Sequence, residues 1–432
     1  MTSHARIAYL TDAEGRWDKL ASFCEGSDEV QLRGDGTLEL ADEVSLVFGG
    51  DVCDRGPDAR RLIETFLDAQ RRYGDRVVLL AGNRDLNKLR LRRELAGHPP
   101  PSTPSGLRDG PRAALLHWIL SHTMGAREAF EHRRRELFSA EGGAAEEPAT
   151  MDDERVAESF LDDVAPGGPM LRYLRACRLA HRAGTTLFVH GGVTSESLGV
   201  VPGRERLTSV DAWIAALNEL LVDELDRFDR GASPDTILAY QAPQPGTIWN
   251  QASIVYGRLA DEDANPVLPD DAVIATLAEH GVSRVVVGHT PSGDCPAIVR
   301  APSVRGSRLH ASSVRGPSVG RGAFELVLAD NSYGRVEHGA RVCVDDRETR
   351  VTGRTVLDDG SEARVSTRLA LEDESPIGLR DEASGRLVKA RLEGGEFLTF
   401  LGLPGRRVAQ TRVSEDELAR WRLVPPRPRP RG

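Results

Sequence analysis

The chain has 432 residues, of which 40% are hydrophobic and 28% are charged, and its formal net charge is −10. This composition is typical of a folded enzyme and excludes a disordered or fibrous chain. The negative charge argues against general nucleic-acid binding, which depends on basic patches. The five cysteines form no CxxC pair and no run of about 18 apolar residues occurs, so we expect a cytoplasmic protein without a membrane span.

Short apolar runs that end in polar clusters recur between Arg6 and Thr290. They are RIAYLTDAEG, VSLVFGGDVCDRG, RVVLLAGNRD, TLFVHGG and RVVVGHT. Runs of this length, rich in Val, Ile and Leu, predict buried strands. The segment between the second and third runs has apolar residues at helical spacing, which predicts a strand–helix–strand order. Open α/β sheets bind their ligands at such strand ends, so the polar clusters are the first place to look for a site.

The remaining sequence predicts additions to this α/β core. Residues 1–335 are expected to form one catalytic domain, interrupted at about 91–183 by a helical, charge-rich insertion with a low-complexity joint, SAEGGAAEEPAT. A second interruption, APSVRGSRLHASSVRGPSVGRG, contains SVRG at Ser303 and Ser313 and is typical of a surface loop. Residues 336–423 predict a small β-rich C-terminal module, and residues 424–432 a Pro/Arg-rich tail without a packed core.

The strand ends carry residue types that bind metal ions. The candidate ligands are Asp12, Glu14, Asp51, Asn83, His190 and His289. Two divalent cations about 3.5–4 Å apart need a bridging carboxylate and further oxygen or nitrogen ligands from several strands. Glycines beside the ligands let the backbone approach the metals closely. A lone strand-end histidine is usually structural and a lone aspartate usually caps a turn, but their joint occurrence in one order favours a metal site.

The motifs TDAEG, GGDVCDRG, GNRD, VHGG and GHT resemble those of the calcineurin-like metallophosphoesterases. GDVCDRG and VHGG are most similar to the Ser/Thr phosphoprotein phosphatase and symmetrical diadenosine-tetraphosphatase branch. The resemblance spans about residues 6 to 335 and implies an α/β fold, a four-layered α/β/β/α sandwich. It implies one metal on Asp12, Glu14 and Asp51, a second metal on Asp51, Asn83, His190 and His289, and a phosphate contact from Arg55.

The first motif departs from the family pattern DxH, because Glu14 stands where the family has a histidine. A carboxylate in place of an imidazole hardens the first metal site. The expected cofactors are therefore two divalent ions, Mn²⁺ first, with Mg²⁺, Fe and Zn²⁺ as alternatives. In the opposing interpretation Glu14 turns away and the first metal is weakly bound or absent.

The third motif departs from GNH(D/E), because Arg84 stands where the family has the histidine that is thought to protonate the leaving group. Arginine cannot serve as an acid near neutral pH, because its pKa exceeds about 12. Its planar fork of donors can clamp a phosphate. The alternative is a structural ion pair between Arg84 and Asp85, the residue that orients the family's acid.

These residues predict a hydrolytic mechanism in which a metal-bridging hydroxide attacks phosphorus in line. Asp51 bridges the metals, while Arg55 and Arg84 offset charge on the phosphoryl oxygens. Weaker candidates for substrate contacts are Lys88, Tyr256 and Arg258, and Tyr256 fits a core position equally well.

The predicted activity is hydrolysis of a phosphomonoester or a nucleotide phosphoanhydride. The substrate would be a phosphorylated small molecule, a nucleotide or a phosphopeptide. A phosphodiesterase is the second hypothesis, although Pro291 occupies a position where many diesterases of the family have a second histidine. The third hypothesis is a phosphate- or nucleotide-binding module with little turnover, because both histidines of the DxH and GNH motifs are missing.

Overall fold

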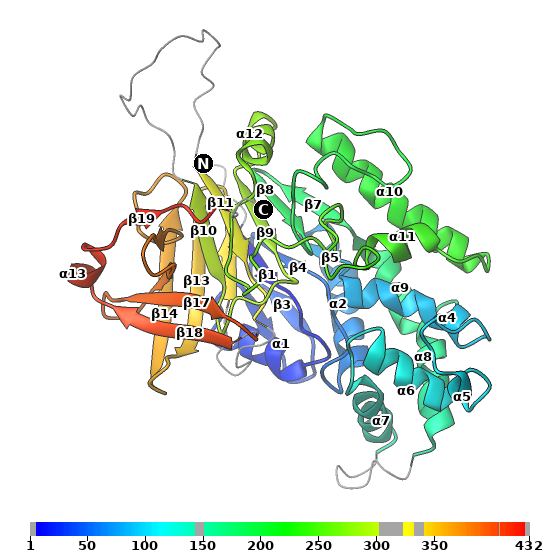
Figure 1. Ribbon diagram of the computed structural model, residues 1–432. Coiled ribbons are helices and arrows are strands. Elements are labelled where there is room, and N and C mark those ends of the chain that lie inside the picture. The colour runs from blue at the N-terminus through cyan, green and yellow to red at the C-terminus, as the bar shows by residue number, and fades with distance from the viewer. Residues whose placement is uncertain (1–5, 143–150, 302–322, 332–340, 406, 428–432) are drawn as a thin grey trace.

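The computed structural model describes residues 6–142, 151–301, 323–331, 341–405 and 407–427 (Figure 1). The SVRG segment from Ser303, residues 143–150 of the low-complexity joint and residues 428–432 of the predicted tail lie outside the described residues. In the part of the chain that is described, no helix is both long and apolar enough to cross a membrane.

The first sheet has the strand order β14-β13-β12-β1-β4-β5-β6. Its strands are β1 (Arg6–Leu10), β4 (Val44–Phe48), β5 (Val77–Leu80), β6 (Cys177–Arg178), β12 (Arg341–Val344), β13 (Glu348–Val356) and β14 (Glu362–Ala370). The strands β1, β4, β5 and β6 run parallel. Their carboxyl ends therefore meet at one edge, which gathers the first three polar motifs.

The second sheet has the order β10-β11-β9-β8-β7. Its strands are β7 (Ala180–Ala183), β8 (Thr186–Val189), β9 (Arg284–Val287), β10 (Ala297–Ala301) and β11 (Phe324–Leu328). The strands β8, β9 and β11 run parallel, so the two histidine motifs also leave the sheet at one edge. All five strands predicted from the apolar runs are present, as β1, β4, β5, β8 and β9.

Alternating side chains of the strands pack against two different partners. Tyr9 of β1 points into the layer between the sheets, where its ring stacks on Phe188 of β8 with centroids 5.7 Å apart, beside Val286. Its neighbours Ala8 and Leu10 point to the opposite face, which is covered by helices. This period of two, repeated in both sheets, produces the α/β/β/α sandwich that the family resemblance implies.

Helices cover the outer faces of both sheets. They are α1 (Trp17–Cys24) and α2 (Ala59–Tyr73) beside the first sheet, and α10 (Val210–Asp229), α11 (Asp235–Tyr240) and α12 (Asp271–Glu279) on the side of the second. The predicted helix between the second and third runs is α2, which buries Leu62, Ile63 and Phe66. Phe66 stacks on Phe48 of β4 with ring centroids 4.2 Å apart. A small hairpin, β2 (Val30–Leu32) and β3 (Leu38–Leu40), lies between α1 and β4.

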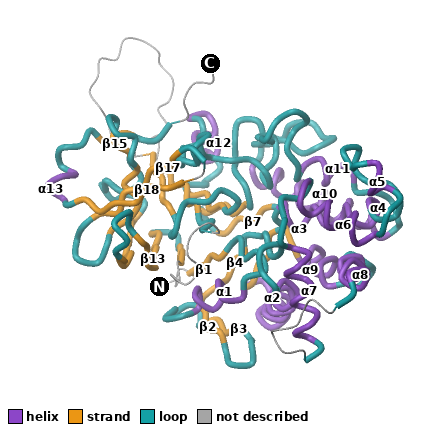
Figure 2. The backbone as a smooth tube through the Cα atoms, turned by 60° about the horizontal axis from the view of Figure 1, so that its bottom comes forward, coloured by secondary structure: helices purple, strands orange, loops and turns teal. Residues whose placement is uncertain are grey.

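The described residues from 83 to 176 are helical, and part of them share a separate hydrophobic core, whereas residues 177–183, the end of the region expected to be a helical insertion at about 91–183, form strands β6 and β7. The helices of this region are α3 (Asn83–Leu86), η2 (Asn87–Leu89), α4 (Arg90–Glu94), α5 (Ser105–Arg108), α6 (Arg112–His122), α7 (Ala129–Ala140), α8 (Asp153–Asp163) and α9 (Pro169–Ala176), and the turn η1 (Gly74–Arg76) precedes β5. Leu116, Ile119, Phe130 and Phe160 form the centre of this core. Figure 2 shows these helices gathered at one end of the molecule, away from the C-terminal strands.

Residues expected to form one C-terminal module divide between two sheets. Strands β12, β13 and β14 extend the first sheet, because β12 pairs with β1 in register from Ile7↔Val344 to Tyr9↔Val342. This pairing covers the edge of β1, which would otherwise expose unpaired backbone groups. The third sheet has the order β18-β17-β16-β15-β19. Its elements are β15 (Arg380–Asp381), β16 (Leu387–Arg391), β17 (Phe397–Leu403), β18 (Arg407–Val413), α13 (Glu415–Leu418) and β19 (Leu423–Val424).

A buried ion pair joins the first two sheets at the amino end of β9. Arg284 Nε lies 3.0 Å from Glu325 Oε2, and neither side chain has exposed surface. Arg284 Nη1 donates to the carbonyl of Asp345, and Thr349 Oγ1 donates to Glu325, so both partners also contact the first sheet. A second guanidinium, Arg300, lies 3.6 Å from the other oxygen of Glu325. One carboxylate therefore neutralises two buried cations.

We expect Glu325→Gln to lower the free energy of unfolding by about 3–5 kcal/mol, because it leaves buried guanidinium charge uncompensated. The measurement is urea unfolding followed by tryptophan fluorescence. Glu219→Gln is the matched control, since Glu219 pairs with Arg204 at 2.9 Å on the surface and should cost less than about 1 kcal/mol. Equal losses in both variants would contradict a structural role for the buried pair.

Candidate metal centre and active site

The loops that follow β1, β4, β5, β8 and β9 bring the candidate ligands to one place between the two sheets. Four of these ligands adopt the left-handed backbone region: Asp12 at φ 51°, Glu14 at 50°, Asp51 at 58° and His289 at 61°. This conformation is costly for residues other than glycine and persists where the surrounding structure enforces it, commonly at functional sites.

The most tightly clustered ligands are Asp51, His190 and His289, which are buried and offer ligand atoms within 4.8 Å of one another. His190 Nδ1 lies 2.7 Å from the carbonyl oxygen of Gly49 and must donate to it. Its Nε2 lies 3.3 Å from Asp51 Oδ1 and 3.3 Å from Asn83 Oδ1. His190 Nε2, Asp51 Oδ1 and Asn83 Oδ1 thus lie close together. Their lone pairs repel one another unless a cation lies between them.

Without a metal, the surroundings of His190 favour a proton on its ring. Burial is the largest influence on the pKa of His190 and lowers it, but Asp51, Asp12 and the carbonyl of Gly49 together raise it to about 10. Metal binding would displace this proton, as it does at imidazole ligands in general.

His289 also has the properties that a metal ligand needs, a neutral ring and an available nitrogen. Its Nε2 is buried and has no hydrogen-bond partner among the described residues. Burial, together with the charge of Arg258, holds the pKa of His289 well below its usual value, so the ring is neutral and its lone pair is available. The backbone N–H of His289 donates to Asp12 Oδ2 at 3.1 Å, which fixes the loop. Asp51, Asn83, His190 and His289 therefore fit a divalent metal ion.

Glu14 faces the centre instead of turning away. Its Oε1 lies 3.1 Å from Arg55 Nε and 2.9 Å from Arg84 Nε. Burial raises the pKa of Glu14 to about 7, against the lowering effect of both guanidiniums. A metal on Asp12, Glu14 and Asp51 would therefore have to share Glu14 with two arginines.

Arg84 contacts a set of carboxylates that does not include Asp85. Besides Glu14, its guanidinium lies 3.6 Å from Asp51 Oδ2 and 3.3 Å from Asp54 Oδ2. Burial would lower the pKa of Arg84, but the carboxylates, Glu14 first, raise it above its usual value. Arg84 therefore remains a cation and cannot donate a proton to a leaving group.

Asp85 joins two of the loops through the backbone. Its oxygens accept the N–H groups of Asp51 at 2.9 Å, Val52 at 2.8 Å and Gly82 at 2.8 Å. The side chain is fully buried. Adjacent residues on a helix point about 100° apart, which explains why Arg84 and Asp85 serve different partners. This geometry supports a positioning role for Asp85.

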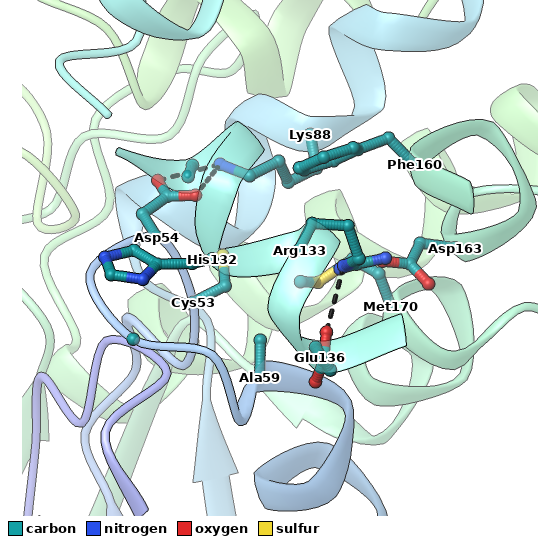
Figure 3. Close-up of a pocket in the computed structure, with 12 residues that line it drawn as sticks. Cys53, Asp54, Ala59, Lys88, His132, Arg133, Glu136, Phe160, Asp163 and Met170 are labelled. Carbon is teal, nitrogen blue, oxygen red and sulfur yellow. Dashed lines mark hydrogen bonds and ion pairs between the residues drawn. The ribbon is translucent and has the colours of Figure 1, made fainter. Parts of the chain in front are cut away.

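Lys88 lies on the inner side of the same loops, beside the helical insertion (Figure 3). Its ammonium donates to Asp54 at 2.9 Å, to Asn87 Oδ1 at 2.8 Å and to the carbonyl of Arg84 at 3.0 Å. These bonds use all its protons, and the side chain is buried. The structure thus places Lys88 as a support for Asp54 rather than as a group facing a substrate. A cavity of about 20 Å³ separates this pair from His132 of α7.

The two remaining candidates for substrate contacts lie beside His289. The Tyr256 ring is tilted against the His289 ring with centroids 5.0 Å apart, and Tyr256 is half-buried. Arg258 lines a cleft of about 1060 Å³ that opens next to the centre. The segment that carries both residues is fixed to the His190 loop by the bond from Gly191 N to the carbonyl of Ile254, 2.7 Å long.

Sequence reasoning missed three residues of the centre. Asp54 stands inside the GDVCDRG motif but was assigned no role, although Arg84 and Lys88 both pair with it. Lys19 donates from α1 to the carbonyl of Asp12 at 2.7 Å, and nothing in the sequence marks it. Asp330 follows β11, the neighbour of β9, and its charge contributes to raising the pKa of Asp12. The strand-end rule applied to FELVLADN would have found Asp330.

The two-sheet sandwich, with carboxylates, an amide and histidines at its joined strand ends, has the architecture of a metallophosphoesterase. The model of the calcineurin-like phosphoesterase family matches residues 5–293, and the chain belongs to this family. No curated protein matches the chain.

The chain also matches solved structures at low sequence identity. A cold-active protein-tyrosine phosphatase of a psychrophilic Shewanella species is 16% identical, with a TM-score of 0.42 over 84% of this chain and 80% of that chain. A protein serine/threonine phosphatase from Saccharomyces cerevisiae is 11% identical, with a TM-score of 0.36 over 80% and 74%. A metallophosphoesterase from Sphaerobacter thermophilus is 13% identical, with a TM-score of 0.28 over 86% and 90%.

We expect the protein purified with Mn²⁺ to bind close to two ions per chain, and Asp51→Asn to lose more metal than Glu14→Ala. Asp51 would contact both ions, whereas Glu14 would contact one and already pairs with two arginines. Elemental analysis and Mn²⁺ titration calorimetry measure the two quantities. Asp28→Asn, at an exposed carboxylate, is the control. Absence of bound metal in the parent protein would contradict the assignment.

Proposed function

We propose that this chain is a metal-dependent phosphoesterase that hydrolyses phosphomonoesters or nucleotide phosphoanhydrides. The observation that carries the proposal is the convergence of Asp51, His190 and His289, where His289 Nε2 has no partner in the described part of the chain. Arg84 lies 3.6 Å from Asp51, and Arg55 joins the same loops through Glu14. A cation site next to fixed arginines suits a phosphoryl group, whose charge spreads over several oxygens.

Six residues would hold a dinuclear centre: Asp12, Glu14, Asp51, Asn83, His190 and His289. The carboxylates make the ligand set hard, which favours Mn²⁺. Divalent ions bound there would supply a water of lowered pKa and would polarise the phosphoryl oxygens.

The protein's own groups bind and orient the phosphate. Arg55 is part-exposed, with 31% of its side chain accessible, and its Nε pairs with Glu14 at 3.1 Å, so its planar fork of donors lies at the centre within reach of a phosphate. Arg84 is more deeply fixed, with 14% of its side chain exposed, and supplies a constant positive charge. Asp85 and the Lys88–Asp54 pair hold the loops on which these groups stand.

In the presence of Mn²⁺ the protein should hydrolyse p-nitrophenyl phosphate, and a chelator should abolish this turnover. The bis(p-nitrophenyl) ester should react more slowly, because Arg55 and Arg84 match the additional charged oxygen of a monoester. Faster turnover of the diester would favour a phosphodiesterase. Phosphate binding without turnover of either ester would favour a binding module.

In the same assay Arg55→Ala should reduce kcat/KM by at least about tenfold, because a phosphate clamp is lost. Arg55→Lys should recover little of this loss, since a point charge does not reproduce a bidentate fork. Mn²⁺ content, measured in parallel, should not fall in either variant. Parent-like turnover in Arg55→Ala would refute its role.

The fixed charge of Arg84 leads to a separate expectation about the leaving group. Without a group that delivers a proton, the logarithm of kcat/KM should fall steeply with leaving-group pKa across a series of phosphomonoesters. Arg84→His alone should harm all substrates, because it also removes the ion pair with buried Glu14. The double variant Glu14→His/Arg84→His should restore activity, most for alkyl phosphates. A flat dependence with chemistry rate-limiting would show that another residue supplies the proton.

A further inference from the structure

A large cleft opens beside the metal centre, and several carboxylates line it. Its volume of about 1060 Å³ reaches the upper end of the range for small-molecule sites, which is about 300–1,000 Å³. Thr194, Gln251 and Arg258 line the end near the centre. Carboxylates and an exposed loop line the rest.

The near end of the cleft is built from the same loop as the metal ligands. Thr194 follows His190 by four residues, and its hydroxyl donates to the carbonyl of Gln251 at 2.6 Å. The side chain of Gln251 in turn donates to the carbonyl of Arg258 at 3.0 Å. Arg258 is close enough to His289 for its charge to lower the pKa of that ring. A phosphate held at the centre would therefore have the rest of its molecule at the mouth of this cleft.

The far wall is acidic and its charge is not neutralised. Glu262, Asp263 and Asp270 line the cleft, and within the described ranges no hydrogen bond or ion pair engages their carboxylates. Asp261 differs, because its carboxylate accepts backbone N–H groups of its own loop. Three uncompensated carboxylates on a concave surface attract cations and repel polyphosphates. The cleft thus opposes a dinucleoside polyphosphate and suits a positively charged ligand.

The structure already contains one cation on this wall. Arg427 lines the cleft and its Nη1 lies 2.5 Å from Asp271 Oδ1. The residue before it, Pro426, accepts a backbone hydrogen bond from Leu268 N at 2.8 Å. An extended proline–arginine segment is therefore bound here through both its main chain and its guanidinium. A basic peptide would be recognised by the same two kinds of contact, a hydrogen bond to its extended backbone and an ion pair with its cationic side chain.

We propose that this cleft binds a basic polypeptide segment, so that the substrate is a phosphorylated residue flanked by arginine or lysine. The phosphate lies at the metal centre with Arg55, and the flanking cations lie against Glu262, Asp263 and Asp270. Trp249, which is half-buried, also lines the cleft, and an aromatic ring attracts such cations. This substrate class rests on the proposed function, whereas binding of the basic peptide in the cleft does not require turnover.

The test uses a fluorescent peptide with a central serine flanked by arginines, and a matched peptide with glutamates in their place. Fluorescence anisotropy of the unphosphorylated peptides measures binding to the full chain at low salt. The triple variant Glu262→Gln/Asp263→Asn/Asp270→Asn should weaken binding of the arginine peptide by about tenfold. The control triple Asp28→Asn/Asp109→Asn/Glu158→Gln removes the same charge from exposed positions elsewhere and should bind like the parent. Equal affinity of both triples, or of both peptides, would overturn the proposal.

Two further experiments, with a truncated chain and with phosphorylated peptides, distinguish the remaining explanations. If the arginine peptide binds only to a chain that ends at Pro426, the occupant of the cleft is the protein's own C-terminal segment, and a substrate site is refuted. With phosphorylated peptides, the cleft triple should raise KM for the arginine peptide and leave kcat/KM for p-nitrophenyl phosphate unchanged. Peptide binding that depends on the cleft, without turnover of any phosphate ester, would refute the proposed function and uphold the cleft assignment.

Discussion

Burial of negative charge is the constraint on which the rest of this site depends. Asp12, Glu14, Asp51, Asp54 and Asp85 are all buried within a few adjoining loops. Unpaired carboxylates in such a place would be costly, so each must have a cation, a metal or a set of N–H donors. Arg84 and Lys88 neutralise part of the charge, and backbone N–H groups surround Asp85. At Asp51 and the two histidines the compensation is incomplete: Asp51 and His190 share a contact of 3.3 Å, and His289 Nε2 has no partner among the described residues. These are the groups that fit a metal.

The same constraint unites the two departures from the family's motifs. Glu14 introduces a carboxylate where the family has a histidine, and Arg84 introduces a guanidinium where it has another histidine. The structure places these two side chains 2.9 Å apart. One substitution adds a buried negative charge and the other compensates it, so the pair leaves the net charge of the centre almost unchanged. We infer that the two changes are coupled and that either alone would destabilise the loops.

The third sheet supports the loop that follows His289 at the same centre. Lys389 of β16 is fully buried and donates to the carbonyl of Ser292, in the loop that follows His289. Gln410 of β18 reaches Asp294 of this loop, although at 3.5 Å the contact is weak. Asp294 also accepts the backbone N–H of Val356 from the first sheet at 2.9 Å. The C-terminal strands therefore brace the loop that sets the left-handed conformation of His289.

The sequence by itself determined the buried strands and the order of the polar clusters at their ends, because these follow from local periodicity and from the chemistry of single side chains. The helical character of most of residues 91–176 also follows from their 3.6-residue pattern. Only the tertiary structure decided which partner Arg84 takes, that Lys88 is enclosed, that β12 to β14 complete the first sheet, and that an acidic cleft adjoins the centre. Each of these depends on residues far apart in the chain, such as Arg84 with Glu14 and Arg427 with Asp271. The local sequence does not determine such pairings. Any of several carboxylates could pair with the same cation, and only the fold sets the distances between them.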